Sequence, residues 1–337
     1  MLKTKKTEAI AGIDIGSYSV KCVETARAGA GIELRRALIA PVNREADLKA
    51  ILAQFDLASA GHVRIALSGP SVVTRLISMP FLNPRELQGA IRFEAESQIP
   101  FPIDECVLDH QVIRQDGVGK TMKVMLVAAK RDLVEARYKL LTELGIHPEA
   151  IDVDVFCLVN ASETLGPESG EKSYGLLNVG HQVSSLAIIH EGRPVFVREI
   201  AAGGLGVTRD LAETKNISEA QADEMKIRKP AGETEALKAA TLKGYESLTE
   251  EIRHSIDYVE NEIKEEIGGI RLSGGGALAH SAVEILTQET GKPVAFWDNL
   301  KNMQVAKGAG AATTAEGSAT LNIALGMTFR SVGVLKK

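Results

Sequence analysis

The stretch Gly12-Ile-Asp-Ile-Gly-Ser-Tyr-Ser-Val-Lys21 decides the fold, because it places a carboxylate, a small-residue turn and a lysine within one hairpin. Residues 9–23 read as a strand, a tight turn and a second strand. Backbone N–H groups of a turn with Gly16, Ser17 and Ser19 can cradle phosphate oxygens, Lys21 can neutralise their charge, and Asp14 can hold Mg²⁺ through water. Taken alone, the stretch is equally consistent with a hairpin that carries a structural aspartate.

The second half of the chain repeats this theme. Strands are predicted at 175–179, 184–190 and 194–200, with a turn at Gly180 between the first two. Asn178 takes the place of Asp14 here, so two such turns facing each other across a cleft would clamp one triphosphate from both sides. Because Asn178 is neutral where a second carboxylate would order Mg²⁺ and the attacking water, we expect slow or absent hydrolysis. The alternative is an ordinary hairpin of a sheet.

Two glycine-rich segments follow predicted strands in this half. Ser273-Gly274-Gly275-Gly276 lies between a short strand at 270–272 and a helix at 280–290, so it can admit adenosine and an α-phosphate beside a helix N-terminus. Its spacing matches neither the Walker A loop nor the dinucleotide-binding fingerprint. Gly203-Gly204 follows another predicted strand and strengthens the same prediction.

Other segments predict an insert in the first half. Strands at 63–67 and 72–77 read as the rest of a mixed sheet, and a helix at 47–55 precedes them. Asn83-Pro84-Arg85-Glu86 has the cap, proline and glutamate of a helix start, and residues 79–151 form a β/α unit of their own. Apolar residues spaced by three or four predict a long amphipathic helix at 246–267.

Composition limits the class of protein. A chain of 337 residues exceeds the size at which one core keeps growing, which favours two large lobes. The net charge of −5, without a long Lys/Arg block, argues against a nucleic-acid partner. Three widely spaced cysteines indicate neither a disulfide framework nor a zinc site. Since no apolar stretch could span a bilayer and no secretory signal is present, we expect a cytoplasmic protein that reaches the membrane only through a partner.

The ordered set of these turns and glycine pairs resembles the actin, Hsp70 and sugar-kinase superfamily. Within that superfamily the chain resembles the PilM family of type IV pilus inner-membrane platforms. The stretches that carry this resemblance cover nearly the whole chain and are Arg75-Leu-Ile-Ser-Met-Pro80, Phe93-Glu-Ala-Glu-Ser-Gln-Ile-Pro-Phe-Pro102, Val127-Ala-Ala-Lys-Arg131, Gly145-Ile-His-Pro148, Ala222-Asp-Glu-Met-Lys226 and Ala324-Leu-Gly-Met-Thr-Phe-Arg330.

The resemblance implies an α/β, actin-like (ribonuclease H-like) ATPase fold with duplicated lobes and an insert subdomain like that of the cell-division protein FtsA. The expected subdomains are 1A at 8–78, continued by 152–173 and 318–332; the insert 1C at 79–151; 2A at 174–206 and 268–317; and 2B at 207–267. The insert that the resemblance implies coincides with the β/α unit that the sequence pattern predicts at 79–151.

The resemblance also implies roles for single residues, with ATP and Mg²⁺ as cofactors. Asp14, Ser17, Ser19 and Lys21 would meet the β- and γ-phosphates and the metal, and Asp223 and Lys226 would approach the ribose or adenine. Gly274, Gly275 and Gly276 would line the base. Asp152 or Asp154 in the connecting segment is a candidate for orienting water, and Asp14 and Asp154 are the catalytic candidates. ATPase activity itself stays open, because Asn178 replaces the usual aspartate.

The implied partner is a short cytoplasmic N-terminal peptide of the membrane protein PilN, bound between the first lobe and the insert. Met79, Phe81 and Leu82 are candidates for that contact, with interior packing as the alternative for each. The resulting prediction is an ATP-binding scaffold that links PilN to other platform proteins and pilus motor ATPases. Two alternatives are an actin-fold small-molecule kinase and an FtsA-like filament protein, for which the C-terminal segment 332–337 is too short to form an amphipathic anchor.

Overall fold

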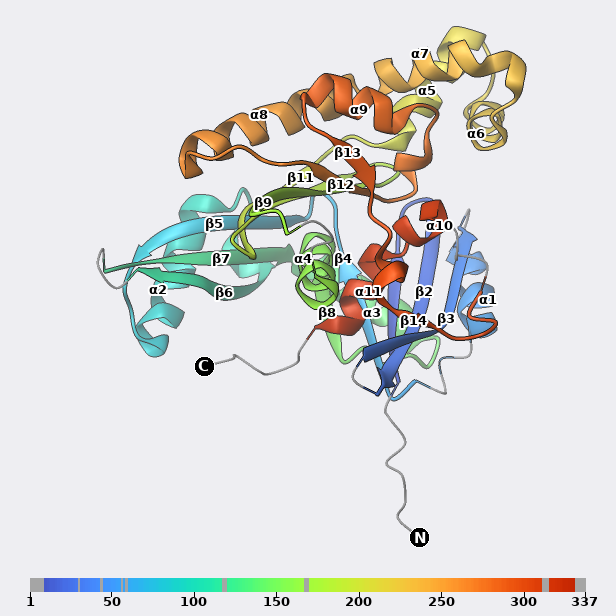
Figure 1. Ribbon diagram of the computed structural model, residues 1–337. Coiled ribbons are helices and arrows are strands. Elements are labelled where there is room, and N and C mark those ends of the chain that lie inside the picture. The colour runs from blue at the N-terminus through green and yellow to red at the C-terminus, as the bar shows by residue number, and fades with distance from the viewer. Residues whose placement is uncertain are drawn as a thin grey trace.

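The structure is a computed structural model that describes residues 9–29, 31–42, 45–55, 57, 60–116, 120–166, 170–310 and 315–330. Across these ranges the strands form three sheets, of six, five and three strands. Figure 1 shows the five-stranded sheet lying between a layer of helices above and the rest of the chain below, with the three-stranded sheet projecting to one side. The terminal segment 332–337, expected to be too short for an anchor, lies outside the described residues.

The six-stranded sheet belongs to the first lobe and has the order β14-β3-β2-β1-β4-β8. Its strands are β1 Ile10–Ile15, β2 Ser19–Ala28, β3 Gly31–Pro41, β4 His62–Leu67, β8 Ala150–Val153 and β14 Gln304–Val305. The hairpin at 9–23 and the strand at 63–67 are confirmed. Helix α1, Glu45–Phe55, packs its apolar face on this sheet, which confirms the helix predicted at 47–55.

Strand β3 was not predicted from the sequence. Its sequence lacks a clear alternation of apolar and polar residues because Glu33, Arg35 and Arg36 lie close together. Charged residues of this kind are also depleted in strands. The structure neutralises them locally: Arg36 pairs with the buried Glu24 of the neighbouring strand, and its guanidinium also lies over the Phe55 ring.

The three-stranded sheet forms the insert, with the antiparallel order β5-β7-β6. Its elements are β5 Val72–Pro80, α2 Pro84–Gln98, η2 Ile103–Glu105, β6 Cys106–Asp116, β7 Thr121–Lys130 and α3 Arg131–Thr142. The predicted helix start is confirmed, since Asn83 and Glu86 form a reciprocal capping box. We expected 72–77 to extend the first-lobe sheet, and that was wrong: β5 pairs with β7 along its whole length, after the chain leaves that sheet at Ser68-Gly69-Pro70. The bounds of the subdomains stay a prediction.

The five-stranded sheet of the second lobe repeats the plan of the first, with the order β11-β10-β9-β12-β13. Its strands are β9 Ser173–Val179, β10 Ser184–His190, β11 Arg193–Ile200, β12 Ile270–Ser273 and β13 Val294–Phe296. In each lobe an antiparallel meander of three strands continues, on the side of its first strand, into a parallel strand: β4 beside β1, and β12 beside β9. The weak internal repeat seen in the sequence is therefore a duplication of architecture.

Helices cover the far side of the second sheet (Figure 1). They are α5 Gly204–Lys215, α6 Glu219–Arg228, η3 Ala231–Glu233, α7 Thr234–Gly244, α8 Glu246–Ile263, η4 Gly276–Leu278 and α9 Ala282–Thr290. The predicted apolar face of α8 is buried, but the helix ends at Ile263 rather than at 267. The reason is local: Lys264 adopts the left-handed conformation, and the Glu260 carboxylate accepts a hydrogen bond from the N–H of Ile267 at 2.6 Å.

Two helices lie between the sheets at the centre of Figure 1, α4 Asp154–Leu165 and α11 Asn322–Phe329, and they pack against each other. The short elements η5 Asn299–Asn302 and α10 Ala315–Ala319 lead into α11. Among the described helices, none combines the length and apolarity needed to cross a membrane.

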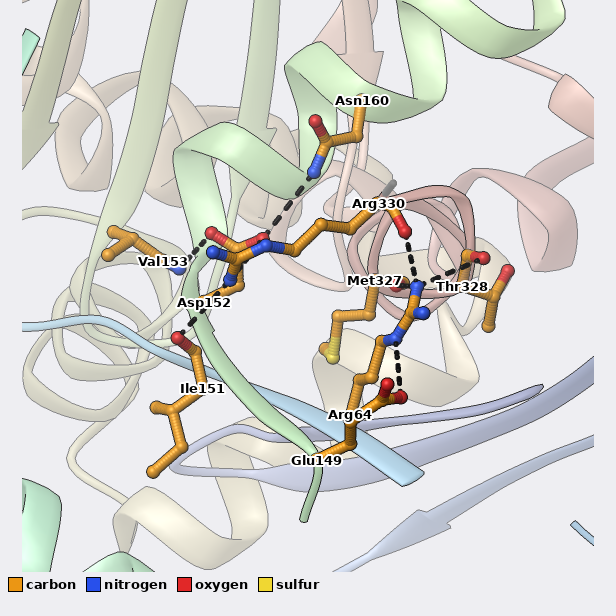
Figure 2. A network of polar contacts seen from close by, with 9 residues as sticks. All are labelled: Arg64, Glu149, Ile151, Asp152, Val153, Asn160, Met327, Thr328 and Arg330. Carbon is orange, nitrogen blue, oxygen red and sulfur yellow. Dashed lines mark hydrogen bonds and ion pairs between the residues drawn. The ribbon is translucent and has the colours of Figure 1, made fainter. Parts of the chain in front are cut away.

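A polar network fixes the end of α11 to the edge of the first sheet (Figure 2). Arg64 of β4 donates to the carbonyls of Met327 at 3.2 Å and Arg330 at 2.6 Å, and its Nε lies 3.5 Å from the Glu149 carboxylate. Arg330 in turn lies 3.4 Å from the Asp152 carboxylate. Asp152, one of the two candidates for orienting water, is therefore used to hold the C-terminal helix in place.

Candidate functional site

The first hairpin turn joins β1 to β2. The motif of residues 12–21 that forms it contains two charged residues, Asp14 and Lys21. Asp14 and Lys21 stand opposite each other in the antiparallel register, and their side chains form an ion pair with Nζ 3.1 Å from Oδ2. The turn closes with the Gly16 N–H donating to the Ser19 carbonyl at 3.1 Å. A carboxylate and an ammonium thus lie buried side by side, next to a turn of small residues.

The second hairpin turn joins β9 to β10 and occupies the equivalent place in the other lobe. The Gly180 N–H donates to the Val183 carbonyl at 3.2 Å, as Gly16 does to Ser19 in the first turn. Asn178 is buried, and its amide oxygen accepts a hydrogen bond from the Ser273 hydroxyl at 3.4 Å. The same hydroxyl lies closer to the Leu177 carbonyl, at 3.1 Å, so the contact with Asn178 is the longer of the two.

The glycine segments converge on the second turn. The N–H of Gly204 donates to the Gly180 carbonyl at 2.9 Å, and a Cβ on Gly276 would stand only 2.4 Å from that same oxygen. Gly274 has φ of +93°, and a Cβ there would meet the Val179 carbonyl oxygen at 2.3 Å. Glycine is required at these places because backbone meets backbone without room for a side chain.

One cavity of about 750 Å³ lies between the lobes and gathers most of the predicted site. The predicted residues that line it are Asp14, Gly16, Ser17, Ser19, Lys21, Asp154, Asn178, Gly180, Gly204, Asp223, Lys226, Gly275 and Gly276. Gly203 and Gly274 do not line it; each packs instead against the turn of residues 179–181. What each residue does there stays a prediction.

Asp223 and Lys226 lie one helical turn apart on α6, with Lys226 Nζ 2.7 Å from Asp223 Oδ1. Lys226 also donates to the Gly204 carbonyl at 3.2 Å and the Thr208 hydroxyl at 2.6 Å. Burial raises the pKa of Asp223, but hydrogen bonds from Lys226, Tyr18 and Thr208 outweigh it and lower the pKa below its usual value. This carboxylate is therefore ionised and rich in donors.

Tyr18 is a site residue that sequence reasoning missed. It lies in the first turn, yet its hydroxyl donates to Asp223 Oδ2 in the second lobe at 2.6 Å. Its ring also lies 5.1 Å from the ring of His181 in the second turn. Burial, together with the hydrogen bond and charge of Asp223, raises the pKa of Tyr18 to about 12. The sequence signal that could have identified Tyr18 is its place as the one aromatic residue in the turn Gly16-Ser-Tyr-Ser19.

Asp154 begins α4 at the floor of the cavity. Burial raises its pKa, the charge of Asp14 raises it further, and a hydrogen bond from Ser68 and the charges of Lys21 and Arg137 oppose the rise.

Glu199 of β11 is a second buried acid that the sequence did not reveal. Burial and the charge of Asp154 raise the pKa of Glu199 to about 8, against a hydrogen bond of 2.9 Å that it accepts from the Gly69 N–H.

The residues present suit a magnesium nucleotide. Among the described residues, no group of three or more His, Cys, Asp or Glu gathers to hold a metal by protein ligands alone. Mg²⁺ in phosphate sites is held through one or two carboxylates, waters and the phosphates themselves, and Asp14 at the turn meets that requirement. A cavity of this volume is in the range of small-molecule sites.

The residues suggested for a partner peptide differ in exposure. Met79 is 3% exposed and lies in the core of the insert, Leu82 packs against the same core, and Phe81 is 53% exposed. The backbone of Phe81 is held by a 2.8 Å hydrogen bond from its N–H to the Lys120 carbonyl, at the end of β5.

Comparisons with known proteins agree with this architecture. The PilM-PilN type IV pilus biogenesis complex is similar with a TM-score of 0.82 at 24% identity, over 95% of this chain and 97% of that one. The ethanolamine utilization protein EutJ from Carboxydothermus hydrogenoformans has a TM-score of 0.51 at 13% identity, over 95% and 89%. MreB5 of Spiroplasma citri bound to ADP has a TM-score of 0.51 at 12% identity, over 95% of each chain.

At these identities the structural likeness shows the actin-like fold, which confirms the predicted fold class. A family model described as type IV pilus assembly protein PilM matches residues 12–332, almost the entire chain. The protein therefore belongs to the PilM family of type IV pilus assembly proteins.

Proposed function

We propose that this protein is an ATP-binding scaffold of the type IV pilus assembly platform. The observation that carries the proposal is the cavity of about 750 Å³, in which two hairpin turns and an acid–lysine pair from α6 converge. A triphosphate needs cations, N–H donors and a metal-holding carboxylate at one end, and polar groups for a sugar at the other. Both sets line this one cavity.

In this proposal the first turn receives the phosphates. Backbone N–H groups around Gly16, Ser17 and Ser19 face the β- and γ-phosphates, and Lys21 neutralises their charge. Asp14 holds Mg²⁺ through its water shell, and binding of the metal replaces the salt bridge that Lys21 now supplies. Bound Mg²⁺ supplies charge neutralisation and orientation of the phosphates.

The nucleoside end lies against the second lobe. Asp223 and Lys226 would take the ribose hydroxyls or the adenine edge, since both are fixed, polar and on the cavity wall. Gly275 and Gly276 lack side chains and leave space for the base. To bind the ribose, the nucleoside has to compete with Tyr18 for the Asp223 carboxylate.

Binding outweighs hydrolysis in this proposal. Asn178 cannot accept a proton from water, and its amide oxygen already accepts from Ser273. Asp154 is the remaining acid on the cavity wall that could orient water. Because burial and the charge of Asp14 raise the pKa of Asp154, only part of the protein carries the ionised form that can act as a base. We therefore propose weak or absent ATPase activity.

The proposed partner is the N-terminal cytoplasmic peptide of PilN, which would bring the protein to the inner membrane. The similar PilM-PilN complex supports this choice. Strand β6 lies at the end of the three-stranded sheet, so one row of its backbone groups is outside the ladder and can receive an extended peptide. Exposed Phe81 and the adjacent Leu82 offer apolar contacts on the same insert. Contacts with other platform proteins and motor ATPases belong to the same proposal.

The test is a titration of the purified protein with MgATP, followed by a synthetic PilN N-terminal peptide, with phosphate release recorded in parallel. Binding of both ligands with little phosphate release is the expected result. Replacement of Phe81 by Ala should weaken the peptide and leave MgATP binding unchanged. Absence of MgATP binding would refute the nucleotide site, and absence of peptide binding would refute the scaffold role.

A further inference from the structure

Helix α3 of the insert places Arg137 on the wall of the nucleotide cavity. Leu133, four residues earlier on the same helix, lines the cavity as well. Residues at this spacing share one face of a helix, so α3 turns a continuous edge toward the cleft. The insert thus contributes a cation to a site that is otherwise built by the two lobes.

Among the described residues, Arg137 differs from the three lysines that line the cavity by being both half-buried and without a partner, because Lys229 is exposed and the other two lysines are paired. Lys21 is paired with Asp14 and Lys226 with Asp223. Among the described residues, the half-buried guanidinium of Arg137 makes neither an ion pair nor a hydrogen bond. A cation withdrawn from water without hydrogen-bond acceptors is unfavourable, which leaves it ready to receive an anion from the cavity.

The charges around Arg137 show which end of the cavity it serves. Burial lowers its pKa, while the carboxylates of Asp154 and Asp14 act in the opposite direction. Arginine nevertheless stays protonated in proteins. The carboxylates whose charges reach the guanidinium are those of Asp154 and Asp14, at the end of the cavity where the proposed triphosphate ends.

The position of α3 connects this cation to the insert. The helix follows β7 without a loop, and the Arg131 side chain at its start donates to the Cys106 carbonyl of β6 at 3.0 Å. The Lys130 N–H donates to the Ser71 carbonyl at 2.9 Å, just before β5 begins. The base of α3 is thus tied to both outer strands of the insert sheet.

We propose that Arg137 binds the terminal phosphate of the bound nucleotide, so that the insert distinguishes a triphosphate from a diphosphate. This inference rests on the proposed nucleotide site and adds a residue that sequence reasoning missed. The planar fork of arginine suits two phosphate oxygens at once. Loss of the γ-phosphate would leave Arg137 without its anion and release α3.

The experiment measures MgATP and MgADP affinities of the wild-type protein and of Arg137→Gln by calorimetry. We expect Arg137→Gln to weaken MgATP by roughly 10- to 100-fold and MgADP by less than about 3-fold. Arg137→Lys keeps the charge but loses the planar fork. Its MgATP affinity should therefore lie between those of the wild type and Arg137→Gln. Hydrogen exchange in α3 should be slower with MgATP than with MgADP in the wild type, and equal in Arg137→Gln.

Lys139→Gln is the matched control, because Lys139 is an exposed cation on the same helix, 3.9 Å from Glu143 and outside the cavity lining. It should change neither affinity. Equal weakening of MgATP and MgADP by Arg137→Gln, or no weakening, would overturn the role of Arg137 while the nucleotide site stands. Failure of the wild-type protein to bind either nucleotide would instead refute the site itself, and this inference with it.

Discussion

The two hairpin turns of the cleft share one backbone plan and differ in charge. In the first turn, the Asp14 carboxylate lies 3.1 Å from Lys21 Nζ. In the second, neutral Asn178 accepts from Ser273, and the nearby acid of β11, Glu199, has its pKa raised to about 8 and is mainly protonated at neutral pH. The first turn thus presents a charged pair to the cavity, whereas the second turn presents a neutral amide and closely packed glycines.

This difference in charge between the turns predicts that nucleotide binding and nucleotide hydrolysis depend on different residues. Phosphates and metal need the charged side, whereas hydrolysis in a two-sided site needs a carboxylate on the second side to order water. The two lobes share the backbone geometry of the turn. The residue at position 178 then decides whether the second turn contributes a charge. The comparison predicts which substitutions remove binding and which alter turnover.

The largest effect is expected when the charged turn loses its cation. Lys21→Met removes the proposed phosphate contact and leaves Asp14 as an unpaired buried carboxylate that would repel phosphate. MgATP should bind about 100-fold more weakly, or roughly 3 kcal/mol, in calorimetric titration. Lys49→Met removes the same charge from an exposed position on α1 and should leave binding unchanged. An unaltered affinity in Lys21→Met would show that the first turn does not hold the phosphates.

The next effect concerns the neutral turn. Asn178→Asp gives the second turn the carboxylate that the first turn already has, so phosphate release should rise by about 10- to 100-fold while MgATP affinity changes by less than about 3-fold. A continuous phosphate-release assay measures this. The exposed Asn302→Asp adds the same charge elsewhere and should have no effect. If Asn178→Asp does not raise turnover, the asymmetry between the turns is not what limits hydrolysis.

A smaller effect is expected where the two turns touch. The Tyr18 ring lies against that of His181 at a tilt of 38°, and its hydroxyl donates to one oxygen of Asp223. Tyr18→Phe keeps the ring but frees that oxygen for the ribose, so MgATP should bind about 3- to 10-fold more tightly. Tyr258→Phe, on the exposed face of α8, is the control. Weaker binding by Tyr18→Phe would mean that the tyrosine hydroxyl helps to close the cleft over the nucleotide.

The smallest effect is on stability and follows from the raised pKa of Glu199. Between its ordinary value near 4.5 and about 8, the folded state holds a proton that the unfolded state has lost, so stability falls as pH rises through this window. Glu199→Gln keeps an acceptor for the Gly69 N–H and cannot ionise. Its melting temperature should exceed that of the wild type by a few degrees at pH 8 and match it near pH 4.5, at roughly 2–4 °C per kcal/mol.

Exposed Glu250→Gln serves as the control for this pH dependence, since it should leave the melting temperature unchanged across the window. Parallel melting curves for wild type and Glu199→Gln from pH 5 to pH 8 would contradict the buried, protonated state of Glu199.

Local patterns predicted the fold well where one physical cause dominates. The capping box at Asn83, the glycine turns and the period of α8 are each determined by neighbours in sequence, and all three are present. The strand predicted at 72–77 is present, but its assignment to the first-lobe sheet was wrong, because its own pattern is that of any half-buried strand. Only pairing with β7, some fifty residues away, decides its sheet. Strand β3 was not predicted, because its charges are neutralised by contacts that the sequence does not show, Arg35 with Glu33 and Arg36 with Glu24 of β2.

The site was predictable to the extent that it lies in turns. Asp14, Lys21 and Asn178 could be found because spacing within a hairpin fixes their positions. Arg137 and Glu199 could not, because a helix and a strand carry many charged residues, and only the tertiary arrangement shows which of them faces a cavity or is buried. Tyr18 reaches a residue 205 positions away, a contact that no local pattern encodes.

The most direct test of the account is a crystal structure of the protein with Mg²⁺ and a non-hydrolysable ATP analogue. We predict the triphosphate over the turn of residues 16–19, with Lys21 and Arg137 on the phosphates, Mg²⁺ beside Asp14, and the nucleoside between α6 and Gly275–Gly276. A nucleotide bound elsewhere, or bound in this cavity with its phosphates directed away from Asp14 and Lys21, would contradict the account.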